Sequence, residues 1–130
     1  MADTALGFDL EYPPLNSAQR GALSTTLGPK VALANPLDYH TYIWGDTAAM
    51  TACYAGMLDA TLALGVLVLD FPRADRCDDS AWRLVLGCAE EASKAKKTPL
   101  AILASLAETC LLYTSPSPRD QRGSRMPSSA

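Results

Sequence analysis

Several signatures of common protein classes are missing from this chain of 130 residues. It has only 4 cysteines, and no two of them form a Cys-x-x-Cys pair. Such cysteine usage argues against a disulfide framework or a zinc site and is typical of a reduced cytoplasmic protein. The apolar runs are too short to cross a bilayer, and the pattern of a secretory signal peptide is not present. We therefore expect a cytoplasmic protein without a membrane partner.

Positive charge and phosphate-binding motifs are also scarce. The chain has 11 Lys and Arg against 14 Asp and Glu, for a net charge of −3, and its basic residues form no cluster. A mildly acidic surface argues against nucleic acid or an anionic membrane as partner. The motifs GxGxxG, GxxxxGK[ST] and GxSxG do not occur. The sequence therefore predicts no catalytic residue and no metal site of its own.

The last 21 residues, 110–130, differ from the rest of the chain. They read CLLYTSPSPRDQRGSRMPSSA, rich in serine, proline and arginine and without apolar periodicity. A composition of this kind cannot bury enough surface to offset the entropy of ordering. The string is similar to a translated sequencing adapter, and we interpret it as a non-native, disordered tail. The alternative is a native disordered tail. Either way, the interpretable part is residues 1–109, which are enough for one domain.

Apolar patterning in residues 1–109 alternates between helical segments and short apolar runs. We expect a first helix to begin at Asn16 and to stop at Gly28-Pro29. A second helix is expected to begin at Asp46 and to end at Gly65. A third is expected to begin at Asp78 or Asp79 and to end before Thr98-Pro99. The runs 30–34, 66–69 and 100–104 are expected to be buried strands. This order predicts a doubly wound, three-layer α/β domain with a parallel sheet. We expect the domain to be incomplete, because a first strand is missing from the pattern.

Polar side chains follow the predicted strands at their carboxyl ends, where open parallel sheets bind ligands. Asp38 and His40 follow the first strand, and Asp70 and Arg73 follow the second. We expect these four residues to lie on one edge of the sheet and to face one cleft. They are the candidate site.

Each candidate residue also has a purely structural interpretation. His40, the only histidine, is either a general base or phosphate acceptor or a loop residue bonded to nearby backbone. Asp38 and Asp70 would cap the turn or helix that follows. Arg73 either clamps an anion or pairs in solvent with a nearby aspartate such as Asp75. We expect Asp38 and His40 to organise their loop and not to take part in chemistry.

Two segments of the chain resemble a known enzyme family. The stretch LGPKVALANPLDYHTYIWGD at 27–46 and VLVLDFPRAD at 66–75 resemble the NDP-forming acyl-CoA synthetases, the relatives of acetate–CoA ligase and succinyl-CoA synthetase. The opening run MADTALGFDL at 1–10 is similar to the helix after that family's glycine-rich turn. The resemblance covers about residues 1–108. It implies an incomplete flavodoxin-like domain, the second of two such domains in the family.

The resemblance also implies a function for the parent protein. Family members join a carboxylic acid to CoA with a nucleoside triphosphate, through an acyl phosphate and a phosphohistidine. CoA and ATP with Mg are therefore implied for the parent and no cofactor for the fragment, whose partners would be the parent's other domains. His40 does not match the phosphohistidine loop, so no catalytic residue is transferred and the fragment is expected to be inactive alone.

Two other functions fit the same features. The first is a CoA-sensing regulatory module of a protein lysine acetyltransferase that carries the same ligase-like domains. The second is a stand-alone flavodoxin-like binding domain, such as a receiver. A receiver would need a complete first strand with clustered acidic residues, which the sequence does not contain.

Overall fold

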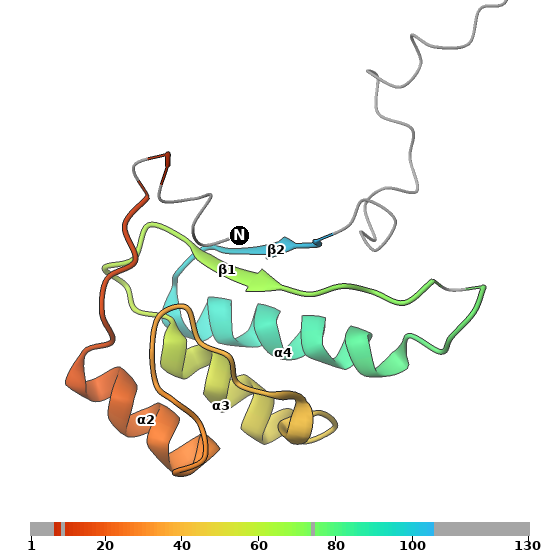
Figure 1. Cartoon of the computed structure of the whole chain (residues 1–130), viewed down its shortest axis with the longest axis horizontal. Helices are drawn as coiled ribbons and strands as arrows, with labels where there is room; N and C mark the ends of the chain where they lie inside the picture. The colour runs from red at the N-terminus through yellow and green to blue at the C-terminus, as the bar shows by residue number, and fades with distance from the viewer. Residues whose placement is uncertain (1–6, 9, 74, 106–130) are drawn as a thin grey trace, which may run out of the picture.

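The computed structural model describes residues 7–8, 10–73 and 75–105. Most of the opening run 1–10, namely residues 1–6 and 9, and the whole tail 110–130 lie outside these ranges, so the expectations for both remain predictions. The elements follow one another as α2 (Ser17–Leu27), the 3-10 helix η1 (Thr41–Ile43), α3 (Thr47–Met57), β1 (Gly65–Val68), α4 (Ser80–Lys96) and β2 (Leu100–Leu103) (Figure 1). Strands β1 and β2 pair in parallel, in a register that runs from Gly65↔Leu100 to Val68↔Leu103. The predicted mixed α/β architecture with a parallel sheet is confirmed.

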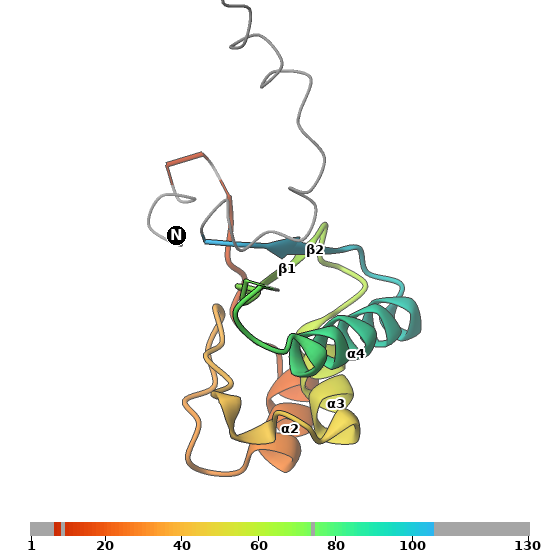
Figure 2. The ribbon, with the colours of Figure 1, turned by 90° about the vertical axis from the view of Figure 1, so that its right-hand side faces the viewer.

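The three α-helices of the described ranges lie on the same side of the sheet. Figures 1 and 2 show α4, α3 and α2 stacked successively away from it. The prediction that β1 is covered on both faces is wrong, because Val66 and Val68 are 55% and 47% exposed. Leu67, between them, packs against the core. Within the described ranges the protein therefore has two layers, and a helical layer on the second face is not seen.

Helix α2 has the boundaries that the sequence predicts. The Asn16 side chain accepts a hydrogen bond from the Gln19 amide at 2.9 Å, and the Gln19 side chain accepts one from the Asn16 amide at 3.0 Å. This reciprocal pair is a capping box, and it satisfies two amides that the helix itself leaves unpaired. At the other end Gly28, with φ of +69°, takes a left-handed conformation that other residues disfavour.

The predicted strand at 30–34 is wrong, because this segment has no regular secondary structure. Its backbone is held by side chains: Arg20 donates to the Leu33 carbonyl at 3.2 Å, and Asn35 donates to the Pro13 carbonyl at 3.0 Å. Val31 is buried in the helical core and Leu33 packs against it. The apolar run therefore fills space beside the helices, and no described strand pairs with it.

The second predicted helix ends at Met57 and not at Gly65. Directly after it, the Asp59 carboxylate accepts hydrogen bonds from the Thr61 amide at 2.9 Å and the Thr61 hydroxyl at 2.8 Å. Aspartate bonded to the backbone two residues onward competes with helical hydrogen bonding. The chain turns there, and β1 begins at Gly65, one residue before the predicted strand start.

Helix α4 begins at Ser80, as expected for a cap at Asp78 or Asp79. Asp79 stands at the cap position without a side-chain capping bond, whereas Asp78 accepts from the Ser80 amide at 3.0 Å. Val85 and Ala89 of this helix are buried. Of the helices in the described ranges, none has the length and apolar character needed to cross a membrane.

Candidate functional site

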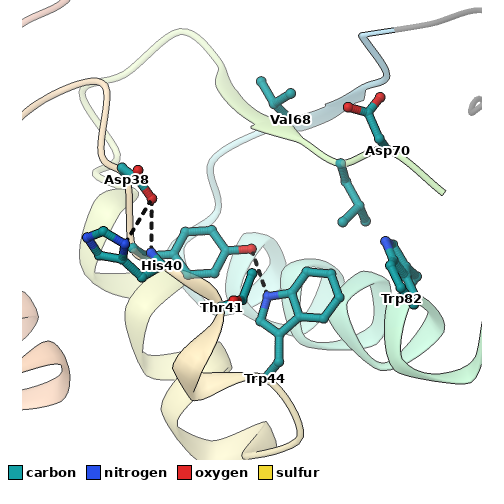
Figure 3. A pocket seen from close by; sticks show the side chains of 9 residues that line it. Asp38, His40, Thr41, Trp44, Val68, Asp70 and Trp82 are labelled. Carbon is teal, nitrogen blue, oxygen red and sulfur yellow. Dashed lines mark hydrogen bonds and ion pairs between the residues drawn. The ribbon is translucent and has the colours of Figure 1, made fainter. Parts of the chain in front are cut away.

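A pocket of about 230 Å³ lies at the carboxyl end of β1. Figure 3 shows Asp38 and His40 on one side of it, Val68 and Asp70 on the other, and Trp44 and Trp82 below. Three segments far apart in the sequence therefore meet here: the loop after position 37, the end of β1 and the first turn of α4. The lining residues are Asp38, Tyr39, His40, Thr41, Trp44, Val68, Leu69, Asp70 and Trp82.

Asp38 fixes the backbone at His40. Its carboxylate accepts a hydrogen bond from the His40 amide at 3.0 Å and lies 3.9 Å from the imidazole Nδ1. His40 has a φ of +56°, a left-handed conformation that is unfavourable for most side chains. The aspartate bond two residues back helps to hold that conformation, and the imidazole stacks on Tyr42 with ring centroids 6.2 Å apart. Asp38 and His40 therefore make the contacts expected of residues that organise their loop.

Asp70 connects the ends of the two strands. Its carboxylate accepts hydrogen bonds from the Ser105 amide at 2.6 Å and the Ser105 hydroxyl at 2.5 Å. Ser105 follows β2, so the contact links the chain leaving β1 to the chain leaving β2. These two bonds go to the neighbouring strand's end and not to the turn after β1. Asp70 therefore positions one wall of the pocket and stabilises the sheet at the same point.

Arg73 does not line the pocket that the other three candidate residues share. Its guanidinium donates two hydrogen bonds to Asp75, at 3.0 and 2.8 Å, and Arg76 lies 3.7 Å from the same carboxylate. The hydrogen bond from Arg73 lowers the pKa of the Asp75 carboxyl. All three side chains are well exposed, so this is the solvated pairing expected as the alternative to anion binding.

An aromatic cluster, which the sequence reasoning did not place in the site, forms the floor of the pocket. The indole of Trp44 donates to the Tyr39 hydroxyl at 3.4 Å, and the Tyr54 hydroxyl donates to the same oxygen at 3.2 Å. Trp44 and Trp82 meet edge to face, with centroids 5.1 Å apart. Burial raises the pKa of Tyr54, so its phenol remains protonated and able to donate. The feature of the sequence that could have indicated this cluster is the concentration of aromatic residues around His40.

The charge of the pocket limits what it can bind. Among its lining residues are two carboxylates, Asp38 and Asp70, and no lysine or arginine. Phosphate groups need cationic side chains or clustered amide donors. The pocket is therefore a poor site for the phosphates of CoA or ATP and suits a neutral or hydrogen-bond-donating group. In the part of the chain that the structure describes, no three metal-ligating side chains come together.

The cysteines of the described region are separate from this site. Cys53 and Cys88 are buried within α3 and α4, and Cys77 is exposed in the loop before α4. Burial raises the pKa of the Cys53 thiol to about 12. Because the thiolate is the nucleophilic form, Cys53 is unreactive at neutral pH.

Comparison with known proteins returned no family model, no curated protein and no solved structure that matches this chain. The function of the pocket must therefore be judged from its geometry and from the segments that form it. Two of those segments are 38–44, within the first resembling stretch, and 68–70, within the second; the third, with Trp82, lies outside both stretches.

Proposed function

We propose that this chain is part of an NDP-forming acyl-CoA ligase, in which it contributes a structural and interface domain. The parent reaction joins a carboxylic acid and CoA, with conversion of a nucleoside triphosphate to the diphosphate and phosphate, in the cytoplasm. The consecutive β1, α4 and β2 elements would form part of a flavodoxin-like domain. The parent's other domains would supply the CoA site, the phosphohistidine and the ATP and Mg site.

One observation supports this proposal above the others. The two stretches that resemble the ligase family, 27–46 and 66–75, are about 20 residues apart in the sequence, yet they form facing walls of one pocket. Resembling segments that are scattered by chance over a fold have no reason to meet at the carboxyl ends of its strands. That end of a parallel sheet is where ligands and partner domains contact α/β proteins.

The acidic lining determines the role that we assign to the pocket. Phosphate chemistry would be opposed by Asp38 and Asp70, and both carboxylates already hold backbone amides. Asp38 shapes the loop and Asp70 joins the strand ends. The pocket would then present a shaped, hydrogen-bonding edge to a neighbouring domain of the ligase, while phosphoryl transfer takes place elsewhere.

Substitution of His40 in the full-length parent tests this role. We expect His40→Gln to change acyl-CoA turnover by less than about tenfold, or roughly 1.4 kcal/mol of barrier, because the imidazole is a loop residue and not a proton carrier. Turnover is measured as acyl-CoA formed from a panel of carboxylic acids. Tyr42→Phe is the control for loss of a structural hydrogen bond in the same loop, because it removes the hydroxyl that donates to the Leu27 carbonyl. A loss near a thousandfold in a folded, CoA-binding variant would place His40 in the chemistry. A parent that forms no acyl-CoA would contradict the ligase proposal itself.

A further inference from the structure

A second, larger cavity borders the sheet. Its volume is about 670 Å³, and most of the residues that line it are apolar. Strand β1 contributes all four of its residues to the wall, whereas β2 contributes only Leu100. The cavity is therefore a groove along the edge of β1 that faces away from β2. The remaining walls come from the segment 10–13, the loop 35–39, helix α3 and the connection 58–64 that leads from α3 into β1.

In the part of the chain that the structure describes, the edge of β1 along this groove pairs with no other strand. The Gly65 amide donates to the Pro99 carbonyl at 2.8 Å, and the Leu69 amide donates to the Leu103 carbonyl at 2.9 Å. Because alternate residues of a parallel strand bond to the same neighbour, the amides and carbonyls of Val66 and Val68 point the other way. Within the described ranges the sheet has only two strands, so no strand pairs with that edge.

The side chains at this edge are apolar as well as accessible. Val66 is 55% exposed, Leu64 is 51% exposed and Leu10 is 55% exposed, and all three line the groove. An exposed apolar edge strand is a template for pairing with another strand. Helix α3 closes the groove from the core side with Tyr54 and Met57, which offer an apolar surface to alternate side chains of an incoming segment.

We propose that this groove binds one extended, apolar peptide strand, which adds to β1 through the backbone groups of Val66 and Val68. A helix satisfies its own amides and would leave this edge unpaired, whereas a strand supplies donors and acceptors at the matching spacing. A segment of four residues, about 13 Å long, is enough to cover β1. The groove would accept such a strand whether or not the chain comes from a ligase.

The test uses the complete 130-residue chain and a fluorescently labelled peptide, KTVTVTVK, in which valines occupy one face. We expect saturable binding below about 1 mM, measured by fluorescence anisotropy. By amide hydrogen exchange, the Val66 and Val68 amides should slow by at least about tenfold on binding, while the Leu67 amide, which faces β2, should change little. The peptide is also prepared with its valine amides N-methylated, and separately with its threonine amides N-methylated. The valine amides lie on one edge of the peptide strand and the threonine amides on the other. At least one modified peptide should therefore fail to bind, because N-methylation removes the donors on the edge that faces β1.

Two variants separate the groove from general apolar adhesion. Val66→Lys should weaken binding by at least about tenfold, because a charge at the edge opposes strand addition. Leu84→Lys changes an equally apolar, 46% exposed side chain on α4 and should leave binding unchanged. Absence of binding at 1 mM of the unmodified peptide, or retained binding of both N-methylated peptides, would overturn the proposal. A dimer of the chain that protects Val66 and Val68 without peptide would assign the groove to a second copy and would also overturn it.

Discussion

Replacement of Leu23 with alanine is expected to remove a large part of the protein's stability. Leu23 is completely buried where α2 packs on α3, and a Cβ atom on Gly56 would lie 3.0 Å from its Cδ2. Truncation of a buried leucine costs about 2–5 kcal/mol, because surrounding atoms only partly fill the cavity. Small domains have about 5–15 kcal/mol of stability when complete. Because the sheet has only two strands within the described ranges, we expect this chain to lie at the low end of that range.

Urea denaturation followed by far-ultraviolet circular dichroism measures this loss. Leu84→Ala is the matched control, because it removes the same atoms from a side chain that is 46% exposed on α4. The control should change the free energy of unfolding by less than about 0.5 kcal/mol. Equal effects of the two substitutions would mean that α2 does not pack on α3 as described.

Gly65→Val is the second substitution with a large expected effect. A Cβ atom at this position would lie 2.5 Å from Cδ2 of Leu58 and 2.9 Å from Cδ1 of Leu100. Both are terminal methyl carbons, but Leu58 is buried and cannot move freely. Overpacking of this kind costs about 1–3 kcal/mol, which exceeds the gain in strand propensity from valine.

The same denaturation measurement applies, with Gly87→Val in the middle of α4 as a control. Apart from the adjoining residues and the nearby backbone of α4 itself, no atom lies within 4 Å of a Cβ built on Gly87, so added volume there meets open space. Gly87→Val should leave stability nearly unchanged or raise it. If Gly65→Val were equally harmless, the close contact between β1, Leu58 and Leu100 would not exist in solution.

Helix starts were the features most accessible from the sequence. Asn16 and Asp46 both cap the helices predicted for them, because a cap is a local contact between a side chain and an amide three residues later. The strands at 65–68 and 100–103 were also found within a residue at each end, since each follows a break and consists of apolar residues.

Errors arose where tertiary contacts decide the structure. The run 30–34 has the composition of a buried strand, but its neighbours are helices and the Arg20 side chain, so its apolar groups fill the core in irregular backbone. Apolar residues continue at helical spacing after Met57, but the turn in which the Asp59 side chain bonds to the Thr61 amide ends the helix. Helices cover one face of the sheet and leave the other exposed. This difference depends on tertiary packing, which a local sequence pattern does not encode.

The candidate site was accessible from the sequence only in part. Asp38, His40 and Asp70 were found because each follows an apolar run, a rule that worked for Asp38 even though the run before it is not a strand. Arg73 was included by the same rule, but its pairing with Asp75 keeps it outside the pocket. Trp44 and Trp82 could not be joined from the sequence, because only the packing of α3 on α4 brings them together.

The proposed function is tested most directly by one comparison of products. The full-length parent protein and the 130-residue chain are assayed side by side for acyl-CoA, nucleoside diphosphate and phosphate, with and without CoA and a panel of carboxylic acids. We expect the parent to form all three products in equal amounts, with strict dependence on CoA and acid, and the chain alone to form none. Acyl-CoA made by the isolated chain, or a parent that transfers acetyl groups to lysine without forming nucleoside diphosphate, would contradict the proposed function.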